Sequence, residues 1–199
     1  MESDSKKPDD EQRIRSLLYK IQKGYTDRDE NVVSEWAEDL FDERVTIIGT
    51  SSIKPGDFEW RNGHAAAIEM FRSDWLNWGD VKLSTEEAEI DIEGNASWVA
   101  VYATVTRDTK KSVNHSAEVS RERSLKRIKQ YSEKEWTTKQ ALYEIIYDAS
   151  MVLTQYERSD IFIWPIRITL GLFQRNNKWL IRQVHFSFPG RGFPNVRLE

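Results

Sequence analysis

Residues 166–188 read IRITLGLFQRNNKWLIRQVHFSF. Two runs of alternating side-chain character, 166–174 and 179–188, flank Asn176 and Asn177, which is typical of a β-hairpin with a tight turn. Alternate residues of a strand point to opposite faces of its sheet. One face would then be apolar, formed by Ile166, Ile168, Leu170, Leu172, Leu180, Val184, Phe186 and Phe188. We expect the rest of the chain to cover this apolar face.

The other face of the hairpin would be polar. It would carry Arg167, Gln183 and His185, together with Thr169 and Ser187. A polar strand face is commonly the solvated side of a sheet, and it is also what the wall of a binding pocket looks like. Both interpretations remain open from the sequence.

Composition limits the class of protein. The 199 residues, 39% hydrophobic and 12% aromatic, suffice for one substantial core, so we expect a single domain over 10–199. A net charge of −4 argues against nucleic acid as a general partner. The lack of cysteine excludes disulfides and thiolate metal sites. The polar start resembles no signal peptide and no window resembles a membrane span, so we expect a cytoplasmic protein that does not enter the membrane.

Over residues 10–107, the periodicity predicts three helices and three strands. Residues 1–9 would form a disordered tail. The expected elements are a helix over 10–25, a second helix capped by Asp29 with apolar residues from Val32 to Phe41, a strand over 45–49, a third helix opened by Asn62 and Gly63, and strands over 81–92 and 96–107.

Between residues 108 and 160 the pattern changes to two helices inserted between strands of one sheet. Residues 108–139 contain nine Lys or Arg and five acids. Such a charge run is usually a solvated helix face, and it would also suit RNA or an acidic partner.

Three stretches carry a resemblance to a known family. They are LFDERVTIIG (40–49), WRNG (60–63) and WLIRQVHFSFP (179–189). Together with the order of elements over 10–107 and 160–190, they resemble the SnoaL-like branch of the nuclear transport factor 2-like superfamily. The inserted helical pair is similar to that of an uncharacterised bacterial subgroup of this branch.

The resemblance implies an α+β fold, in which a curved antiparallel sheet wraps around N-terminal helices as a cone. It also implies a mostly apolar cavity at the open end and a homodimer formed through the sheet. The superfamily includes cyclases, ketosteroid isomerases, dehydratases, kinase association domains and transport factors. The fold therefore does not select a function.

Two residues are candidates for acid–base catalysis. The base of the ketosteroid isomerases aligns near Ile48, where neither Ile47 nor Gly49 can take a proton, so their mechanism is not expected here. His185 on the polar face could replace that base, or could be a hydrogen-bonded structural histidine. Asp74, beside the aromatic face of the third helix, could point into a cavity or lie at its solvated edge.

The candidate ligand-binding residues are mainly aromatic. We expect five rings to meet where the third helix faces the sheet, and two polar groups of the hairpin to orient a ligand. The full set is Trp60, Trp75, Trp78, Trp98, Tyr102, Arg167 and Gln183. Aromatic residues at this spacing also form plain core. Three dispersed histidines predict no metal site, and no motif indicates a cofactor.

The residues support three hypotheses. The first is a binding protein for an unidentified apolar small molecule. The second is an isomerase, cyclase or dehydratase that uses His185 or Asp74 as acid or base. The third is a dimeric interaction module that presents Leu142, Ile145 and Val152 of the inserted helices to a partner.

Overall fold

The computed structural model describes residues 6–50, 52, 54–56, 59–108 and 160–189, with isolated positions between 121 and 149. Most of the predicted tail and most of the predicted helical pair therefore lie outside the described residues. The isolated positions of the insertion are helical, and Leu125, Leu142 and Ile146 among them are exposed. Val152 lies outside the described part.

The described chain contains three helices and a seven-stranded mixed sheet. The helices are α1 (Lys6–Asp27), α2 (Val33–Leu40) and α3 (His64–Asn77). The strands are β1 (Phe41–Ile48), β2 (Trp60–Asn62), β3 (Asp80–Leu83), β4 (Glu89–Glu93), β5 (Ala96–Asp108), β6 (Ile161–Arg175) and β7 (Lys178–Ser187). Their order is β2-β1-β7-β6-β5-β3, and β4 also pairs with β5. The α+β class and the curved sheet are confirmed, but the sheet is not wholly antiparallel as predicted, because β1 lies parallel to its neighbour β7.

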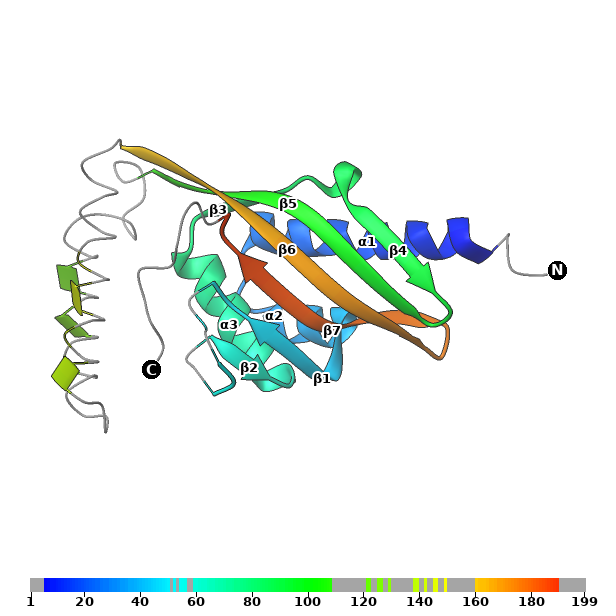
Figure 1. Cartoon of the computed structure of the whole chain (residues 1–199), viewed down its shortest axis with the longest axis horizontal. Helices are drawn as coiled ribbons and strands as arrows, with labels where there is room; N and C mark the ends of the chain where they lie inside the picture. Colours follow the sequence, from blue (N-terminus) through cyan, green and yellow to red (C-terminus); the bar gives the residue numbers. More distant parts are fainter. Residues whose placement is uncertain are drawn as a thin grey trace.

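Helices cover one face of the sheet, which we call the inner face (Figure 1). The long helix α1 contributes Ile14, Leu18, Ile21 and Tyr25, all buried, and its contacts run along β3 and β4. Burying such an apolar stripe against a sheet removes nonpolar surface from water, which is the main source of stability. The predicted helix over 10–25 is longer at both ends, and Pro8 is tolerated in its first turn, where backbone N–H groups have no helical partner.

The segment between α1 and β1 differs from the prediction in its boundaries. Asp29 does not cap α2: its Oδ1 accepts the backbone N–H of Asn31 at 3.0 Å, closing a turn before the helix. Helix α2 ends at Leu40, and strand β1 begins at once with Phe41, four residues before the predicted start. Phe41 is apolar and buried in the core. In the sequence it therefore cannot be distinguished from the apolar stripe of the preceding helix.

The predicted strand over 81–92 is two strands separated by the 3₁₀ turn η1 (Thr85–Glu87). Leu83 pairs with Ala103 and Glu89 with Ala100, so the chain advances six residues while β5 advances three. The extra residues loop out, and Arg15 of α1 donates hydrogen bonds to the carbonyl oxygens of Thr85 and Glu86.

The C-terminal hairpin has the predicted turn, because Asn176 and Asn177 both adopt positive φ. Its second strand contains an irregularity that reverses part of the predicted alternation. Ile181 pairs with Leu172 but Gln183 pairs with Gly171, which leaves Arg182 as an extra residue. Trp179 and Ile181 therefore face the core in place of Leu180.

The extra residue Arg182 pairs with the buried carboxylate of Asp42. Its Nη1 lies 3.1 Å from Oδ1 of Asp42, which is only 4% exposed, and Arg44 and Arg175 also pair with this carboxylate. Burial acts to raise the pKa of Asp42, but hydrogen bonds from Arg44 and the charges of Arg175 and Arg182 hold it below its ordinary value.

Six strands have a terminus at the same end of the sheet. Strands β1, β5 and β7 finish there, at Ile48, Asp108 and Ser187, and β2, β3 and β6 begin there, at Trp60, Asp80 and Ile161. The inserted segment leaves the sheet and re-enters it at this end, so we call this end of the sheet the insertion end. Within the part of the chain that the structure describes, no helix is long and apolar enough to cross a membrane.

Candidate functional site

The sheet divides the predicted site residues between its two faces. Asp74, Trp75 and Trp78 lie on the inner side with α3. The opposite, outer face carries Trp60, Trp98, Tyr102, Arg167, Gln183 and His185, as the strand registers and the burial alternation require. The five rings therefore do not meet, because Trp98 and Tyr102 alternate with Val99 and Val101, which point into the core.

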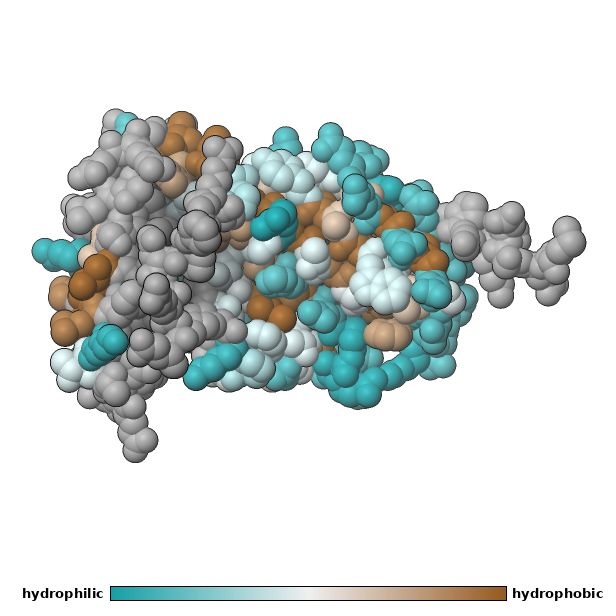
Figure 2. Space-filling model, viewed as in Figure 1, coloured by the Kyte–Doolittle hydropathy of each residue, from teal (hydrophilic) through white to brown (hydrophobic). Residues whose placement is uncertain are grey.

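On the outer face, three rows of side chains cross the strands. Trp98 pairs with Gly171 and then Gln183, and Tyr102 pairs with Arg167 and then Ser187. The row between them runs from Ala100 through Thr169, His185 and Ile48 to Trp60. Trp98 and Tyr102 are 56% and 49% exposed. Figure 2 shows brown and pale side chains over these strands, interspersed with hydrophilic ones.

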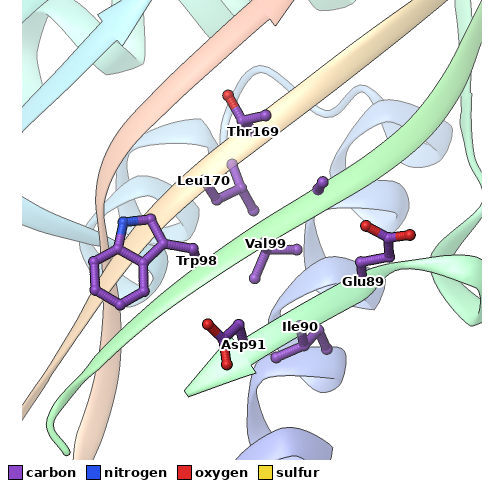
Figure 3. Close-up of a pocket in the computed structure, with 8 residues that line it drawn as sticks. Glu89, Ile90, Asp91, Trp98, Val99, Thr169 and Leu170 are labelled. Atoms are coloured by element: carbon purple, nitrogen blue, oxygen red, sulfur yellow. The ribbon is translucent and has the colours of Figure 1, made fainter. Parts of the chain in front are cut away.

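A shallow pocket of about 330 Å³ lies on this side, between β4, β5 and β6 (Figure 3). It is lined by Glu89, Ile90, Asp91, Trp98, Val99, Ala100, Thr169 and Leu170. Of the predicted ligand-binding residues, only Trp98 lines it. Gly171 of β6 pairs with Trp98 and has no side chain that could cover the indole.

On the inner side, aromatic rings pack against one another. Contacting pairs among Tyr25, Trp36, Phe41, Phe71, Trp75, Trp78 and Phe186 have centroids 4.9 to 6.5 Å apart. Trp75 is only 3% exposed and packs against Trp36 and the backbone at Gly24, where a Cβ would lie 2.8 Å from the indole. Trp75 is therefore core, as the alternative interpretation of these aromatics held.

Asp74 lies at the insertion end of this cluster, beside Tyr25 of α1. The Tyr25 hydroxyl donates a hydrogen bond to Oδ2 of Asp74 at 3.1 Å. Part of Asp74 reaches the surface, yet protein surrounds the carboxyl closely enough that loss of hydration is the largest influence on its pKa. Burial, opposed by the Tyr25 hydrogen bond, raises the pKa of Asp74 from 3.8 to about 7.

Two further charges act on this carboxyl. The negative charge of Glu59 raises the pKa of Asp74, and the guanidinium of Arg107 lowers it. Arg107 is held by a hydrogen bond from its Nε to the Trp78 carbonyl oxygen at 2.6 Å and lies 4.4 Å from the ring centre of Trp164. Burial, then the charge of Asp74, raises the pKa of Tyr25 well above 10, so its phenol is a neutral donor.

The histidines have different surroundings. His64, at the start of α3, donates from Nε2 to the Phe41 carbonyl oxygen at 2.7 Å, which joins α3 to β1. His185 is half-buried on the outer face between Thr169 and Ile48, separated from Asp74 by the sheet. The two predicted catalytic residues therefore cannot share one site. Over the described residues, no group of three or more His, Asp or Glu is arranged to hold a metal ion.

Sequence reasoning missed Tyr25, Glu59 and Arg107. Tyr25 has the only detectable signal, because it places a hydroxyl in the apolar stripe of α1, where a buried phenol needs a partner. Nothing in the local pattern of Glu59 or Arg107 indicates that either would act on a carboxyl of α3.

Comparison with known proteins identifies the fold. No protein-family model matches the sequence, and no curated protein matches it significantly. Solved structures do match, over nearly the whole chain. A nuclear transport factor 2-like superfamily protein from Salmonella enterica is 11% identical, covers 94% of this chain and 96% of its own, and has a TM-score of 0.54.

Two further structures agree. An NTF2-like protein with a cystatin-like fold from Novosphingobium aromaticivorans is 10% identical, with coverages of 92% and 84% and a TM-score of 0.54. A putative dehydratase of the NTF2-like family from Streptomyces avermitilis is 9% identical, with coverages of 92% and 99% and a TM-score of 0.53. At such identities the likeness shows the fold and not the activity. The fold of this chain is therefore that of these nuclear transport factor 2-like structures, a cystatin-like α+β fold.

Proposed function

We propose that the protein binds a small, mostly apolar molecule at the insertion end of the inner face, and that Asp74 exchanges a proton with it. The observation that carries this proposal is the Tyr25–Asp74 pair. A carboxyl with a pKa of about 7 holds and releases a proton equally well near neutral pH, which is what general acid–base catalysis requires.

The surroundings of Asp74 indicate the kind of molecule. Trp78 is half-buried and packs against the buried rings of Tyr25 and Phe186, with centroids 5.5 to 6.5 Å apart. The Tyr25 phenol is a neutral donor that could hold an oxygen of the ligand once Asp74 gives up its hydrogen bond. An uncharged molecule with one polar oxygen fits these groups best.

The structural neighbours are compatible with this proposal. One is described as a putative dehydratase and another, from Novosphingobium aromaticivorans with a TM-score of 0.50, as a putative scytalone dehydratase. Those descriptions concern these proteins. They support acid–base chemistry here only as an analogy of fold.

Native mass spectrometry of the purified protein, followed by denaturation, tests the binding step. We expect a small apolar compound to be released from the wild type, and a tenfold or greater loss of its affinity in Trp78→Ala. Asp74→Asn should keep binding and lose any turnover, because the amide cannot take up a proton. Equal turnover by wild type and Asp74→Asn would contradict the proposal.

We also propose that the outer face joins two copies of the chain in a homodimer. Exposed Trp98 and Tyr102 lie symmetrically about Ala100. A two-fold axis across the strands through Ala100 and Thr169 would bring Trp98 opposite the partner subunit's Tyr102. The same axis would bring Arg167 of the partner subunit over Gly171, beside the Trp98 indole and near Asp91.

Sedimentation of charge-swapped variants tests this arrangement. The wild type should be dimeric, and Arg167→Glu or Asp91→Arg should each weaken the dimer at least tenfold. Combining both changes in one chain should restore it, because the opposite charges still meet. A monomeric wild type, or a dimer that both single changes leave intact, would exclude this interface.

A further inference from the structure

A second carboxylate, that of Glu59, lies against the end of β1. Glu59 lies in the turn before β2, and its carbonyl oxygen accepts the Gly49 backbone N–H at 2.9 Å. The next residue, Trp60, pairs with Ile48. The sheet therefore fixes the backbone of Glu59 at the insertion end.

Gly49 also determines where the Glu59 side chain lies. A Cβ added at Gly49 would lie 2.6 Å from Cβ and 2.8 Å from Cδ of Glu59, which is closer than real Cβ atoms approach. The half-buried side chain of Glu59 therefore lies across the end of β1, in space that only glycine leaves open.

The groups around Asp74 come from four parts of the chain. Tyr25 comes from α1, Asp74 from α3, Arg107 from β5, and Glu59 from the turn at the end of β1. Arg28 acts on Tyr25 from the end of α1. Among these groups, Glu59 supplies the negative charge that acts on Asp74. The backbone of Glu59 is held by β1, independently of α3, which carries Asp74.

Resting on the proposed function of Asp74, we propose that Glu59 is the second acid–base group of the same site. Its carboxylate takes a proton from one atom of a neutral substrate, while the protonated Asp74 carboxyl gives a proton to another atom of that substrate. The two transfers leave the substrate uncharged and the site with the same total number of protons. Return of the proton from Glu59, directly or through water, resets the pair.

Titration of the Asp74 carboxyl by carbon-13 NMR tests the coupling without any ligand. Glu59→Gln should lower the pKa of Asp74 by on the order of one unit, because a like charge is removed. Gly49→Ala should shift it in the same direction, although Glu59 is chemically intact, because the new Cβ displaces its side chain. Glu69→Gln on α3 and Gly171→Ala on the outer face, where a Cβ has ordinary contacts, are matched controls that should leave it unchanged. An unchanged pKa in Glu59→Gln would overturn the proposal.

Proton exchange in deuterated water tests the chemistry, with cyclohexanone and 2-tetralone as probes. Exchange next to the carbonyl should fall at least tenfold in both Glu59→Gln and Asp74→Asn. Loss in Asp74→Asn alone would overturn the role of Glu59 while leaving that of Asp74 intact. Exchange that survives both changes would refute the proposed function itself, whatever the titration shows about the coupling.

Discussion

Replacing Asp74 with asparagine should stabilise the protein at neutral pH but not near pH 4. A carboxyl whose pKa is raised on folding binds its proton more tightly in the folded state. The folded state is then penalised as pH rises from the ordinary value of 3.8 through about 7, where the buried group must ionise. Asparagine has the same shape and an oxygen for the Tyr25 hydroxyl, but it never ionises.

The size of the effect follows from the shift. From 3.8 to about 7, at about 1.4 kcal/mol per pKa unit, the penalty reaches about 4 kcal/mol above pH 8. Part of Asp74 is accessible to solvent, which reduces this limit, so we expect about 2 kcal/mol. Removing a group kept for chemistry commonly raises stability in this way.

Urea unfolding followed by tryptophan fluorescence gives the free energy of unfolding for both proteins between pH 4 and 9. The two proteins should agree within about 0.5 kcal/mol near pH 4 and diverge steadily as pH rises from about 4 to 7, with Asp74→Asn the more stable by a constant amount above about pH 8. Glu38→Gln, which removes an exposed carboxyl of α2, is the matched control and should show no such divergence. A difference that does not change with pH, or a variant less stable at pH 8, would refute the reasoning.

Three further changes test other parts of the structure. Gly24→Ala should cost about 1–3 kcal/mol of stability in thermal unfolding despite the better helix propensity of alanine, because its Cβ would meet Trp75; no loss would exclude this tight packing. Asp42→Asn should cost about 1–3 kcal/mol at pH 7, and this loss should vanish as pH falls through the lowered pKa of Asp42; a loss that persists in acid would contradict the ion-pair account. Tyr25→Phe should raise the pKa of Asp74 by on the order of one unit in carbon-13 NMR, since the hydrogen bond that favours the ionised form is lost; a fall would show that this bond favours the neutral acid.

Much of the fold could be predicted because its signals are local. The alternation of residues 166–174 and the Asn176-Asn177 pair define the hairpin, and the stripe from Ile14 to Tyr25 defines the first helix. Errors occurred where distant contacts override local pattern. Arg182 is displaced from the alternation to meet Asp42, and β3 is separated from β4 by a turn that Arg15 holds from α1.

The candidate site was predictable only in part. Asp74 stood out by its place beside an aromatic helix face, but Trp98, Tyr102 and His185 were grouped with it although the sheet separates them. Alternation tells which side chains share a face of one strand. It does not tell which of the two faces the helices will cover, because that depends on how the whole chain packs.

The amino-acid sequence by itself determined the helices, the hairpins and the superfamily resemblance, since periodicity and turn residues act over a few positions. Only the tertiary structure decided that Asp74 holds a proton near neutral pH. A pKa depends on hydration and on charges nearby in space, and those come from Tyr25, Glu59 and Arg107, which lie 49, 15 and 33 residues away along the chain.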